Sequence, residues 1–295
     1  MNKETKKAEK TGEIASLPIG IFDSGVGGLT VYRALHNRLP NEHFIYLGDT
    51  ARVPYGTKSL ATVERYAIEN SQFLASRGIK MLVVACNTAS ALALPKIRAQ
   101  IGLETVGVIG PGARKAVAVT KSNPRIAVIA TEATVQSDAY PASIRQASGA
   151  AEIIQTACPL FVPLAEENWT RETETFSIAE KYLRKIVEFK PEALVLGCTH
   201  YPILSEVIQQ TVGAHVKLID SGEACAEEVE KLLHEKGLAN PNEVTGERRL
   251  CDDLDHFYVT DAAERFARVA ERFLGSSPSV LEAVEVWGHD ELRTH

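Results

Sequence analysis

The sequence has no long apolar run and no excess of positive charge among its 295 residues. No window approaches the roughly 18 apolar residues that mark a membrane-spanning helix. The formal net charge of −6 gives no support for a nucleic-acid-binding or membrane-binding surface. Residues 1–16 mix charges, contain few apolar side chains and lack the apolar stretch of a secretory signal. We therefore expect a cytoplasmic protein with no nucleic-acid or membrane partner, in which residues 1–16 form a disordered N-terminal extension.

Cysteine is scarce as well, and its pattern argues against two kinds of framework. Five cysteines, an odd number at wide spacings, do not suggest a set of disulfides; they are Cys86, Cys158, Cys198, Cys225 and Cys251. There is no CxxC pair, and Cys198 and His200 have no convincing partners as metal ligands, so we expect no metal site. For a lone cysteine such as Cys158, Cys225 or Cys251, a buried apolar role is the expected one.

The common cofactor motifs are missing too. The glycine-rich turn Gly25-Val26-Gly27-Gly28 has neither the GxGxxG order of a dinucleotide site nor the GK[ST] ending of a P-loop. An anion-binding turn at a helix start and a plain tight turn both remain open for this segment. We also find no flavin or pyridoxal motif, and we expect no cofactor.

What the sequence does contain is a regular alternation of short apolar runs and longer amphipathic segments. Runs that are apolar throughout are typical of parallel strands covered on both faces by helices. Strands are predicted over residues 19–22, 43–48, 80–85, 105–110, 125–130, 151–158, 192–197, 216–221 and 256–260. Helices are predicted over residues 31–39, 60–76, 89–99, 111–119, 134–148, 177–189, 201–212, 226–237 and 261–275. This pattern indicates an α/β protein.

The alternation restarts near residue 125, which suggests an internal duplication. VVACNTAS at 83–90 has a counterpart in VLGCTHYP at 195–202, each with an apolar run, a cysteine and a helix start. We therefore predict two similar lobes, each a mostly parallel sheet flanked by helices, with the active site between them. The predicted first lobe comprises residues 17–114 plus 225–295, and the second comprises residues 115–224.

Cys86 and Cys198 lie where such a fold binds its ligands, beyond the carboxyl ends of parallel strands. Each precedes a helix start, where the helix dipole and free amides lower the pKa of a thiol. One such cysteine would suggest a nucleophile. Two in matching positions suggest two proton carriers, one removing a proton from one face of a carbon and the other delivering a proton to the opposite face. With no cofactor present, preorganised hydrogen bonds would have to stabilise the carbanion.

Polar residues near the two cysteines suit an amino-acid ligand. Asp23 could accept from an ammonium group or orient Cys86, and His200 could assist Cys198 as an acid or ion-pair partner. Glu166 is a candidate second carboxylate, although the residues alone favour a solvated helix charge there. No basic clamp occurs in these turns, so carboxylate binding should rest on hydroxyls, amides and helix N-termini. Small donors are available at Ser24, Asn87, Thr88, Thr131, Thr134 and Thr199.

Five motifs, in order along residues 17–275, resemble the glutamate racemase family. They are GIFDSGVGGLTV, YLGDTARVPYGTKS, ACNTASA, GVIGPGA and LGCTHYP. The resemblance implies a two-lobed α/β fold and cofactor-independent interconversion of L-glutamate and D-glutamate, which supplies D-glutamate for peptidoglycan synthesis. It leaves open a homodimeric assembly and regulation by a cell-wall precursor. Residues 1–16 show no motif that can be tied to such a precursor, and we assign no role to residues 276–295.

The same resemblance implies roles for individual positions. Cys86 and Cys198 match the two catalytic thiols, and Glu166 matches an assisting carboxylate. Asp23 and His200 are expected to take part in both catalysis and binding. The substrate-binding positions that match the family motifs are Asp23, Ser24, Tyr55, Gly56, Asn87, Thr88, Thr199 and His200. Thr131 and Thr134 are added to this set as small donors at a strand end.

Three other interpretations remain open. A related racemase of the same two-cysteine superfamily would act on aspartate or another small dicarboxylate, and turnover of several enantiopure amino acids would separate it. A two-lobed binding protein without chemistry predicts that Cys86→Ser and Cys198→Ser retain binding and lose nothing measurable. Thiol redox chemistry predicts a reversible disulfide between the two sulfurs, which free-thiol titration under oxidation would detect.

Overall fold

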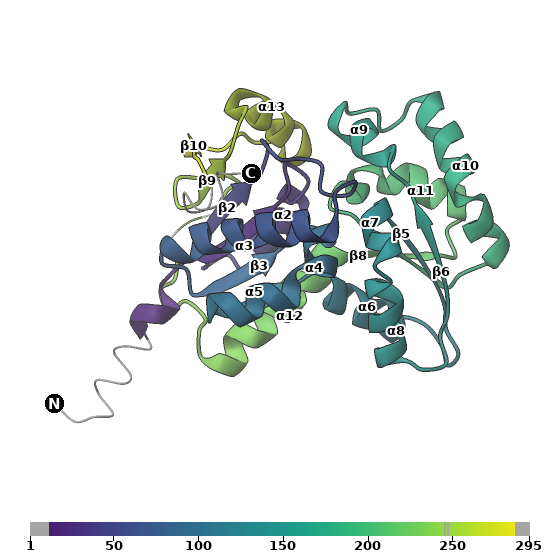
Figure 1. The fold of residues 1–295 in the computed structure, drawn as a ribbon, viewed down its shortest axis with the longest axis horizontal. Coiled ribbons are helices and arrows are strands. Elements are labelled where there is room, and N and C mark those ends of the chain that lie inside the picture. Colours follow the sequence, from purple (N-terminus) through teal and green to yellow (C-terminus); the bar gives the residue numbers. More distant parts are fainter. Residues whose placement is uncertain (1–11, 245, 247, 287–295) are drawn as a thin grey trace.

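Two parallel sheets organise the protein into two lobes (Figure 1). The computed structural model describes residues 12–244, 246 and 248–286. The first lobe is built on a six-stranded sheet of order β10-β9-β2-β1-β3-β4, and the second on a four-stranded sheet of order β6-β5-β7-β8. Every strand pairing in these described sheets is parallel. The predicted α/β fold with two parallel sheets flanked by helices is confirmed.

The strands follow the predicted apolar runs closely. The first sheet comprises β1 (Ile19–Asp23), β2 (Phe44–Gly48), β3 (Met81–Val84), β4 (Glu104–Gly107), β9 (His256–Val259) and β10 (Leu281–Ala283). The second sheet comprises β5 (Arg125–Ala130), β6 (Glu152–Ala157), β7 (Ala193–Gly197) and β8 (Lys217–Asp220). The inner strands β1, β3 and β7 are buried over their whole length because helices cover both faces of each sheet. Sequence analysis assigned no element to the segment that forms β10.

The helices divide between the lobes in the same way. The first lobe carries α2 (Leu29–Arg38), α3 (Leu60–Ser76), α4 (Asn87–Leu92), α5 (Leu94–Ile101), α12 (Ser221–Lys236) and α13 (Ala263–Leu274). The second carries α6 (Ile109–Ala118), α7 (Glu132–Gln136), α8 (Ala139–Ala147), α9 (Phe161–Glu166), α10 (Thr173–Phe189), the 3₁₀ helix η1 (Tyr201–Leu204) and α11 (Ser205–Val212). Helix α12 packs against both α2 and α6, and so joins the two lobes.

Three segments predicted as single helices are each divided in two. The segment 89–99 is α4 followed by α5, and Pro95 lies in the first turn of α5, where the missing N–H costs nothing. The segment 134–148 is divided at Asp138, whose φ of 52° is left-handed and cannot continue a right-handed helix. The segment 201–212 begins as the 3₁₀ turn η1, with Pro202 in its first turn. These are local breaks that apolar periodicity does not record.

The predicted disordered extension is wrong for residues 12–16. Residues 12–15 are helical, and Ala15 is buried. Lys80 Nζ donates to the main-chain oxygen of Ala15 at 2.5 Å and also pairs with Glu42 at 2.5 Å. This buried ammonium fixes the end of the segment against the first lobe. Residues 1–11, to which the prediction also applied, lie outside the described residues.

The core crosses from one sheet to the other. One buried cluster includes Ile21 and Leu29 of the first lobe together with Ala127 and Leu196 of the second. The predicted lobe boundaries at 114/115 and 224/225 fall within α6 and α12, which lie where the lobes meet, and they stay predictions. Within the described part of the chain, no helix is both long and apolar enough to cross a membrane.

Candidate active site

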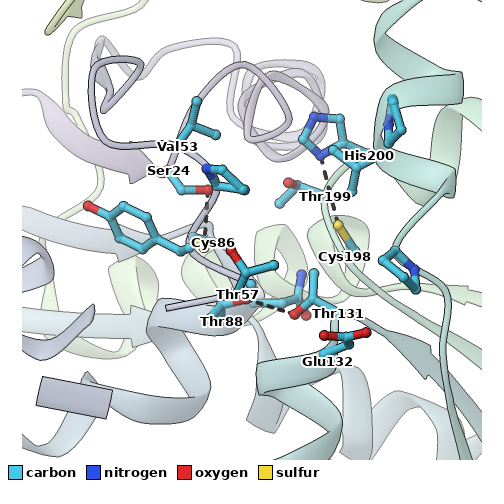
Figure 2. Close-up of a pocket in the computed structure, with 17 residues that line it drawn as sticks. Ser24, Val53, Thr57, Cys86, Thr88, Thr131, Glu132, Cys198, Thr199 and His200 are labelled. Carbon is cyan, nitrogen blue, oxygen red and sulfur yellow. Dashed lines mark hydrogen bonds between the residues drawn. The ribbon is translucent and has the colours of Figure 1, made fainter. Parts of the chain in front are cut away.

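The carboxyl ends of β1, β3, β5 and β7 converge on one cavity of about 170 Å³ between the lobes (Figure 2). Parallel strands end at the same edge of a sheet, and the two edges face one another here. The predicted residues that line the cavity are Ser24, Tyr55, Gly56, Cys86, Asn87, Thr88, Thr131, Cys198, Thr199 and His200. Asp23, Thr134 and Glu166 lie behind this lining and hydrogen-bond to residues in it.

Cys86 follows β3 and caps the start of α4. Its sulfur accepts from the main-chain N–H of Ala89 at 3.5 Å and lies 3.6 Å from Ser24 Oγ, to which the thiol donates. Burial raises the pKa of Cys86 to about 12, the negative charge of Asp23 adds to the rise, and the hydrogen bonds only partly oppose it. The expectation that a helix start lowers the thiol pKa is therefore wrong for Cys86, because desolvation outweighs the amides. Cys86 is therefore a neutral thiol at neutral pH.

Cys198 follows β7 and has a different set of partners. Its sulfur lies 3.8 Å from His200 Nδ1, and His200 Nε2 lies 3.1 Å from Glu166 Oε1. Burial alone would lower the pKa of His200, but hydrogen bonds to Cys198 and Glu166 raise it to about 10. Burial would likewise raise the pKa of Glu166, yet His200 and Arg265 lower it overall. The arrangement therefore holds an imidazolium between a carboxylate and a sulfur, and Glu166 is not the solvated charge that its sequence context favoured.

Asp23 is fully buried beneath the first turn and does not line the cavity. Its carboxylate accepts from the main-chain N–H of Gly25 at 2.9 Å and from Thr199 Oγ1 of the other lobe at 3.4 Å. Burial raises the pKa of Asp23, while the charge of His200 acts in the opposite direction. The thiol of Cys86 bonds to Ser24. No direct contact therefore supports the expected role of Asp23 in orienting that thiol.

The turns around Gly27 bring the two lobes into close contact. A Cβ at Gly27 would lie 2.3 Å from Thr199 Oγ1 and 2.5 Å from the His200 ring, so only glycine fits there. Thr30 Oγ1 of the first lobe donates to the main-chain oxygen of Thr199 at 2.8 Å. The glycine-rich turn is thus a close-approach site that seats the Cys198 turn.

Three threonine hydroxyls meet across the lobe boundary. Thr88 of the first lobe lies 3.0 Å from Thr131 and 3.2 Å from Thr134, and the last two are 2.9 Å apart (oxygen to oxygen). Asn87 accepts from the hydroxyl of Tyr140 at 2.7 Å, which fixes its amide. These contacts orient hydroxyl groups at one end of the cavity, where a carboxylate could replace some of them as partners.

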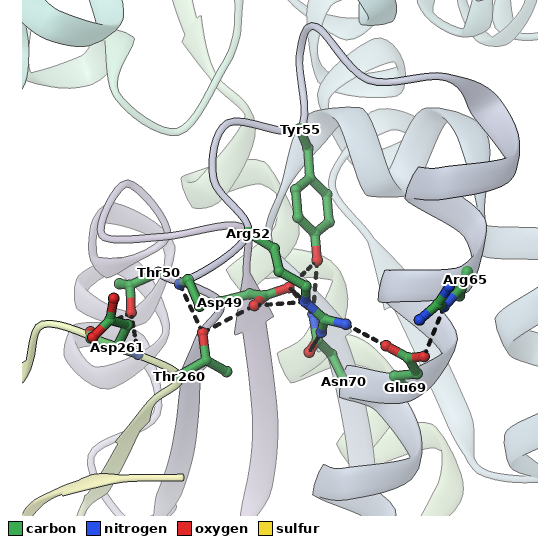
Figure 3. A network of polar contacts seen from close by, with 10 residues as sticks. Asp49, Thr50, Arg52, Tyr55, Arg65, Glu69, Asn70, Thr260 and Asp261 are labelled. Atoms are coloured by element: carbon green, nitrogen blue, oxygen red, sulfur yellow. Dashed lines mark hydrogen bonds and ion pairs between the residues drawn. The ribbon is translucent and has the colours of Figure 1, made fainter. Parts of the chain in front are cut away.

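The loop 53–57 covers one side of the cavity and is held from behind by a buried polar network (Figure 3). The hydroxyl of Tyr55 donates to Asp49 and accepts from Asn70 Nδ2 at 3.0 Å, so it points away from the cavity. Arg52, the nearest cation in sequence to these turns, is directed to Asp49 and Glu69. At the front, the main-chain oxygen of Gly56 accepts from Ala133 at 3.1 Å, which docks the loop on the second lobe.

Sequence reasoning missed seven lining residues, of which all but Thr57 and Glu132 are apolar. Missed residues are Val53, Pro54, Thr57, Glu132, Pro159, Val162 and Pro163. Three of them flank the predicted Tyr55–Gly56 pair, and three lie in the segment just before Glu166, so proximity to a predicted residue was the available signal. Apolar side chains carry no chemical signature that would mark them in a sequence.

The lining as a whole suits a small zwitterion rather than a metal or a large cofactor. Among the lining residues there is no lysine or arginine, and the polar groups are hydroxyls, an amide, the carboxylate of Glu132 and His200. Within the described residues, no group of three or more His, Cys, Asp or Glu side chains could hold a metal ion. Two sulfurs carried by different lobes enter the cavity, so a carbon bound between them could exchange protons with either one (Figure 2).

The chain is similar to known racemases over almost its whole length. The family model for Asp/Glu/Hydantoin racemase matches residues 19–229. A glutamate racemase of Geobacter metallireducens is 50% identical over 257 residues, which cover 87% of this chain and 92% of that one.

Solved structures give the same result. Glutamate racemase of Francisella tularensis in complex with D-glutamate has a TM-score of 0.83 at 37% identity, covering 92% of this chain and 98% of that one. Escherichia coli glutamate racemase, in complex with L-glutamate and the activator UDP-MurNAc-Ala, has a TM-score of 0.73 at 30% identity. The match covers 92% of this chain and 100% of that one. Sequence, fold and the paired cysteines agree, and the chain belongs to the Asp/Glu/Hydantoin racemase family, as one of its glutamate racemases.

Proposed function

We propose that this chain interconverts L-glutamate and D-glutamate without a cofactor, by proton transfer at the α-carbon between Cys86 and Cys198. The observation that carries the proposal is that these two cysteines, from different lobes, line one small cavity. The similar structures hold D-glutamate in one relative and L-glutamate in another. A site that accepts both enantiomers needs a proton carrier on each face of the carbon, and two thiols provide this.

The proposed step balances with the two thiols alone. In one direction, a Cys198 thiolate takes the α-proton, the C–H bond breaks, and the thiol of Cys86 delivers a proton to the other face. The sulfurs then hold each other's starting protonation state, and the reverse reaction begins from there. Because burial holds Cys86 as a thiol, it is the natural acid of the pair, and the sulfur of Cys198, the proposed base, lies 3.8 Å from Nδ1 of the His200 imidazolium.

We propose that hydroxyls and amides bind the substrate. The hydroxyls of Ser24, Thr88, Thr131 and Thr199, with the amide of Asn87, lie on the cavity wall and are the candidate partners of the two carboxylates. The loop that carries Tyr55 and Gly56 closes one side. Asp23 and Glu166 lie behind the lining, so their proposed roles are electrostatic: the charge of Asp23 raises the pKa of Cys86, and Glu166 acts on the Cys198 half through His200.

Racemisation of L-glutamate in deuterated water tests the mechanism. We expect D-glutamate that carries deuterium at the α-carbon, with no added cofactor. Cys86→Ser and Cys198→Ser should each lower the rate by at least about a hundredfold, because a serine hydroxyl is a far weaker acid than a thiol and does not ionise to act as the base. Cys225→Ala, a buried cysteine of α12, is the matched control and should keep the activity. Product without α-deuterium would refute the mechanism.

The same assay addresses the other interpretations. Equal turnover of L-aspartate would favour a broader dicarboxylate racemase. No racemisation by the wild type, with glutamate binding that both serine variants retain, would favour a binding protein without this chemistry. Loss of two free thiols under mild oxidation, reversed by reductant together with activity, would favour thiol redox chemistry.

We also propose that the product supplies peptidoglycan synthesis and that a cell-wall precursor modulates the enzyme. Support comes from the E. coli relative, whose structure contains the activator UDP-MurNAc-Ala. Adding this nucleotide to the assay tests regulation, and an unchanged rate at saturating concentration would contradict it.

A homodimer and a cytoplasmic location stay predictions. Sedimentation analysis would test the first, and cell fractionation would test the second.

A further inference from the structure

The last residue of α9 is held by α13 from the opposite lobe. Arg265 Nη2 donates to Glu166 Oε2 at 3.0 Å, and Arg272 Nη1 donates to the main-chain oxygen of Glu166 at 2.9 Å. The second contact satisfies a helix-end carbonyl that α9 itself leaves unpaired. Figure 1 shows α9 and α13 at the same end of the molecule, one on each lobe. A helix of the first lobe therefore holds Glu166, which lies behind His200, at both its side chain and its main chain.

The same helix also contacts the imidazole. Arg265 and Arg272 are seven residues apart on α13, close to two helical turns, so they share one face. Next to them, the buried Phe273 meets the His200 ring edge-on, with centroids 6.1 Å apart and planes at 88°. Side chains of α13 thus contact both members of the Glu166–His200 pair.

The two halves of the site differ in this respect. The sulfur of Cys86 bonds to Ser24 and Ala89, both of the first lobe, which also carries Cys86 itself. On the other side, polar contacts run from Arg265 through Glu166 and His200 to the sulfur of Cys198, and this series crosses from one lobe to the other. Movement of the lobes apart would separate Arg265 from Glu166 and leave the Cys86 contacts intact.

We infer that Arg265 is a positioning residue for the Cys198 half of the site, acting through Glu166 and His200 when the lobes are closed. This inference rests on the proposed function. Its guanidinium holds the Glu166 carboxylate in place and ionised, the carboxylate orients the imidazolium, and the imidazolium lies against the sulfur of Cys198. The Arg265 side chain is 61% exposed and that of Glu166 is 18% exposed, so solvent weakens the first contact and its effect is moderate.

Three variants separate this role from simple stabilisation of the fold. Arg265→Gln should lower kcat/KM by about three- to tenfold, and Arg265→Lys, which restores the charge, should recover much of the loss. Arg268→Gln is the matched control, because Arg268 is an exposed arginine on the same helix with no ion pair to any described residue. It should change kcat/KM by less than about twofold.

The decisive readout is the primary isotope effect on kcat/KM with α-deuterated L-glutamate and α-deuterated D-glutamate. Each enantiomer loses its proton to a different thiol. When the Cys198 half is impaired, transfer at Cys198 becomes more rate-limiting, so the isotope effect rises for the enantiomer that Cys198 deprotonates and falls for the other. A merely structural loss lowers the active fraction and leaves both isotope effects unchanged.

The outcomes distinguish the inference from the function beneath it. A wild-type protein that does not racemise glutamate would overturn the proposed function, and the inference with it. An active wild type whose Arg265→Gln variant keeps both isotope effects, or loses no more than Arg268→Gln, would overturn the inference alone. Opposite shifts of the two isotope effects, partly reversed in Arg265→Lys, would support it.

Discussion

At the scale of single residues, the environment reverses simple expectations about ionisation. A cysteine at a helix start is normally a candidate for a lowered pKa, yet burial keeps Cys86 protonated. A buried histidine is normally neutral, yet His200 between Cys198 and Glu166 favours the charged form. Two neighbouring groups of the site thus differ in charge for different reasons: desolvation keeps the Cys86 thiol neutral, and hydrogen bonds keep the His200 imidazole charged.

His200 should make the stability of the protein depend on pH. Its pKa is about 10 in the folded protein against 6.5 as the ordinary value, so between these limits the folded state binds a proton that the unfolded state does not. The stabilisation is complete below about pH 6.5 and is lost as pH rises toward 10, at up to about 1.4 kcal/mol per pH unit.

Urea denaturation at several pH values between 6.5 and 10 would measure this. The His200→Asn variant should show a shallower fall of the unfolding free energy with pH than wild type. His215→Asn, at an exposed position, serves as the control and should leave the slope unchanged. Equal slopes in wild type and His200→Asn would show that His200 does not hold the extra proton.

At the scale of elements, strands place the chemistry and loops complete it. The strand ends carry Cys86 and Cys198, and their positions follow from apolar runs that any reader of the sequence can mark. The covering loop 53–57 depends instead on a network that joins β2, α3 and the residue after β9, through Asp49, Asn70 and Thr260. Such a network combines residues far apart in the chain, so no local pattern predicts it.

Tyr55→Phe should loosen this loop without altering the thiols. The change removes a hydroxyl that bonds to Asp49 and Asn70, and we expect a loss of about 1–2 kcal/mol in unfolding free energy. KM for glutamate should rise while kcat changes little, because the loop contributes binding that is equal in the ground state and the transition state. Steady-state kinetics and urea denaturation measure both effects.

Tyr66→Phe is the matched control, since the Tyr66 ring packs beside that of Tyr55 at a tilt of 48° and its hydroxyl bonds to no residue that the structure describes. It should leave KM and stability near the wild-type values. A fall of kcat at unchanged KM in Tyr55→Phe would count against this account of the loop.

At the scale of the whole molecule, the lobes are joined too closely to unfold separately. They share a buried cluster, α12 packs on helices of both, and Thr30 bonds across to Thr199. We therefore expect one cooperative transition in urea. In a Trp287→Phe variant, the fluorescence of Trp169, which follows α9 in the second lobe, should report the same midpoint as the far-UV circular dichroism of the whole chain. Two separate midpoints would contradict a shared core.

The sequence by itself determined the α/β class, the course of most strands and the pair of cysteines at matching strand ends, because these depend on local apolar runs and motifs. It also marked Asp23, His200 and Glu166, although it could not tell a buried carboxylate from a solvated one. Only the tertiary structure decided which groups meet: the threonine contact between Thr88 and Thr131, the apolar lining, and the reach of α13 to Glu166. Those contacts join segments up to about a hundred residues apart, and the free energy that stabilises them comes from burial and charge pairing that exist only once the chain has folded.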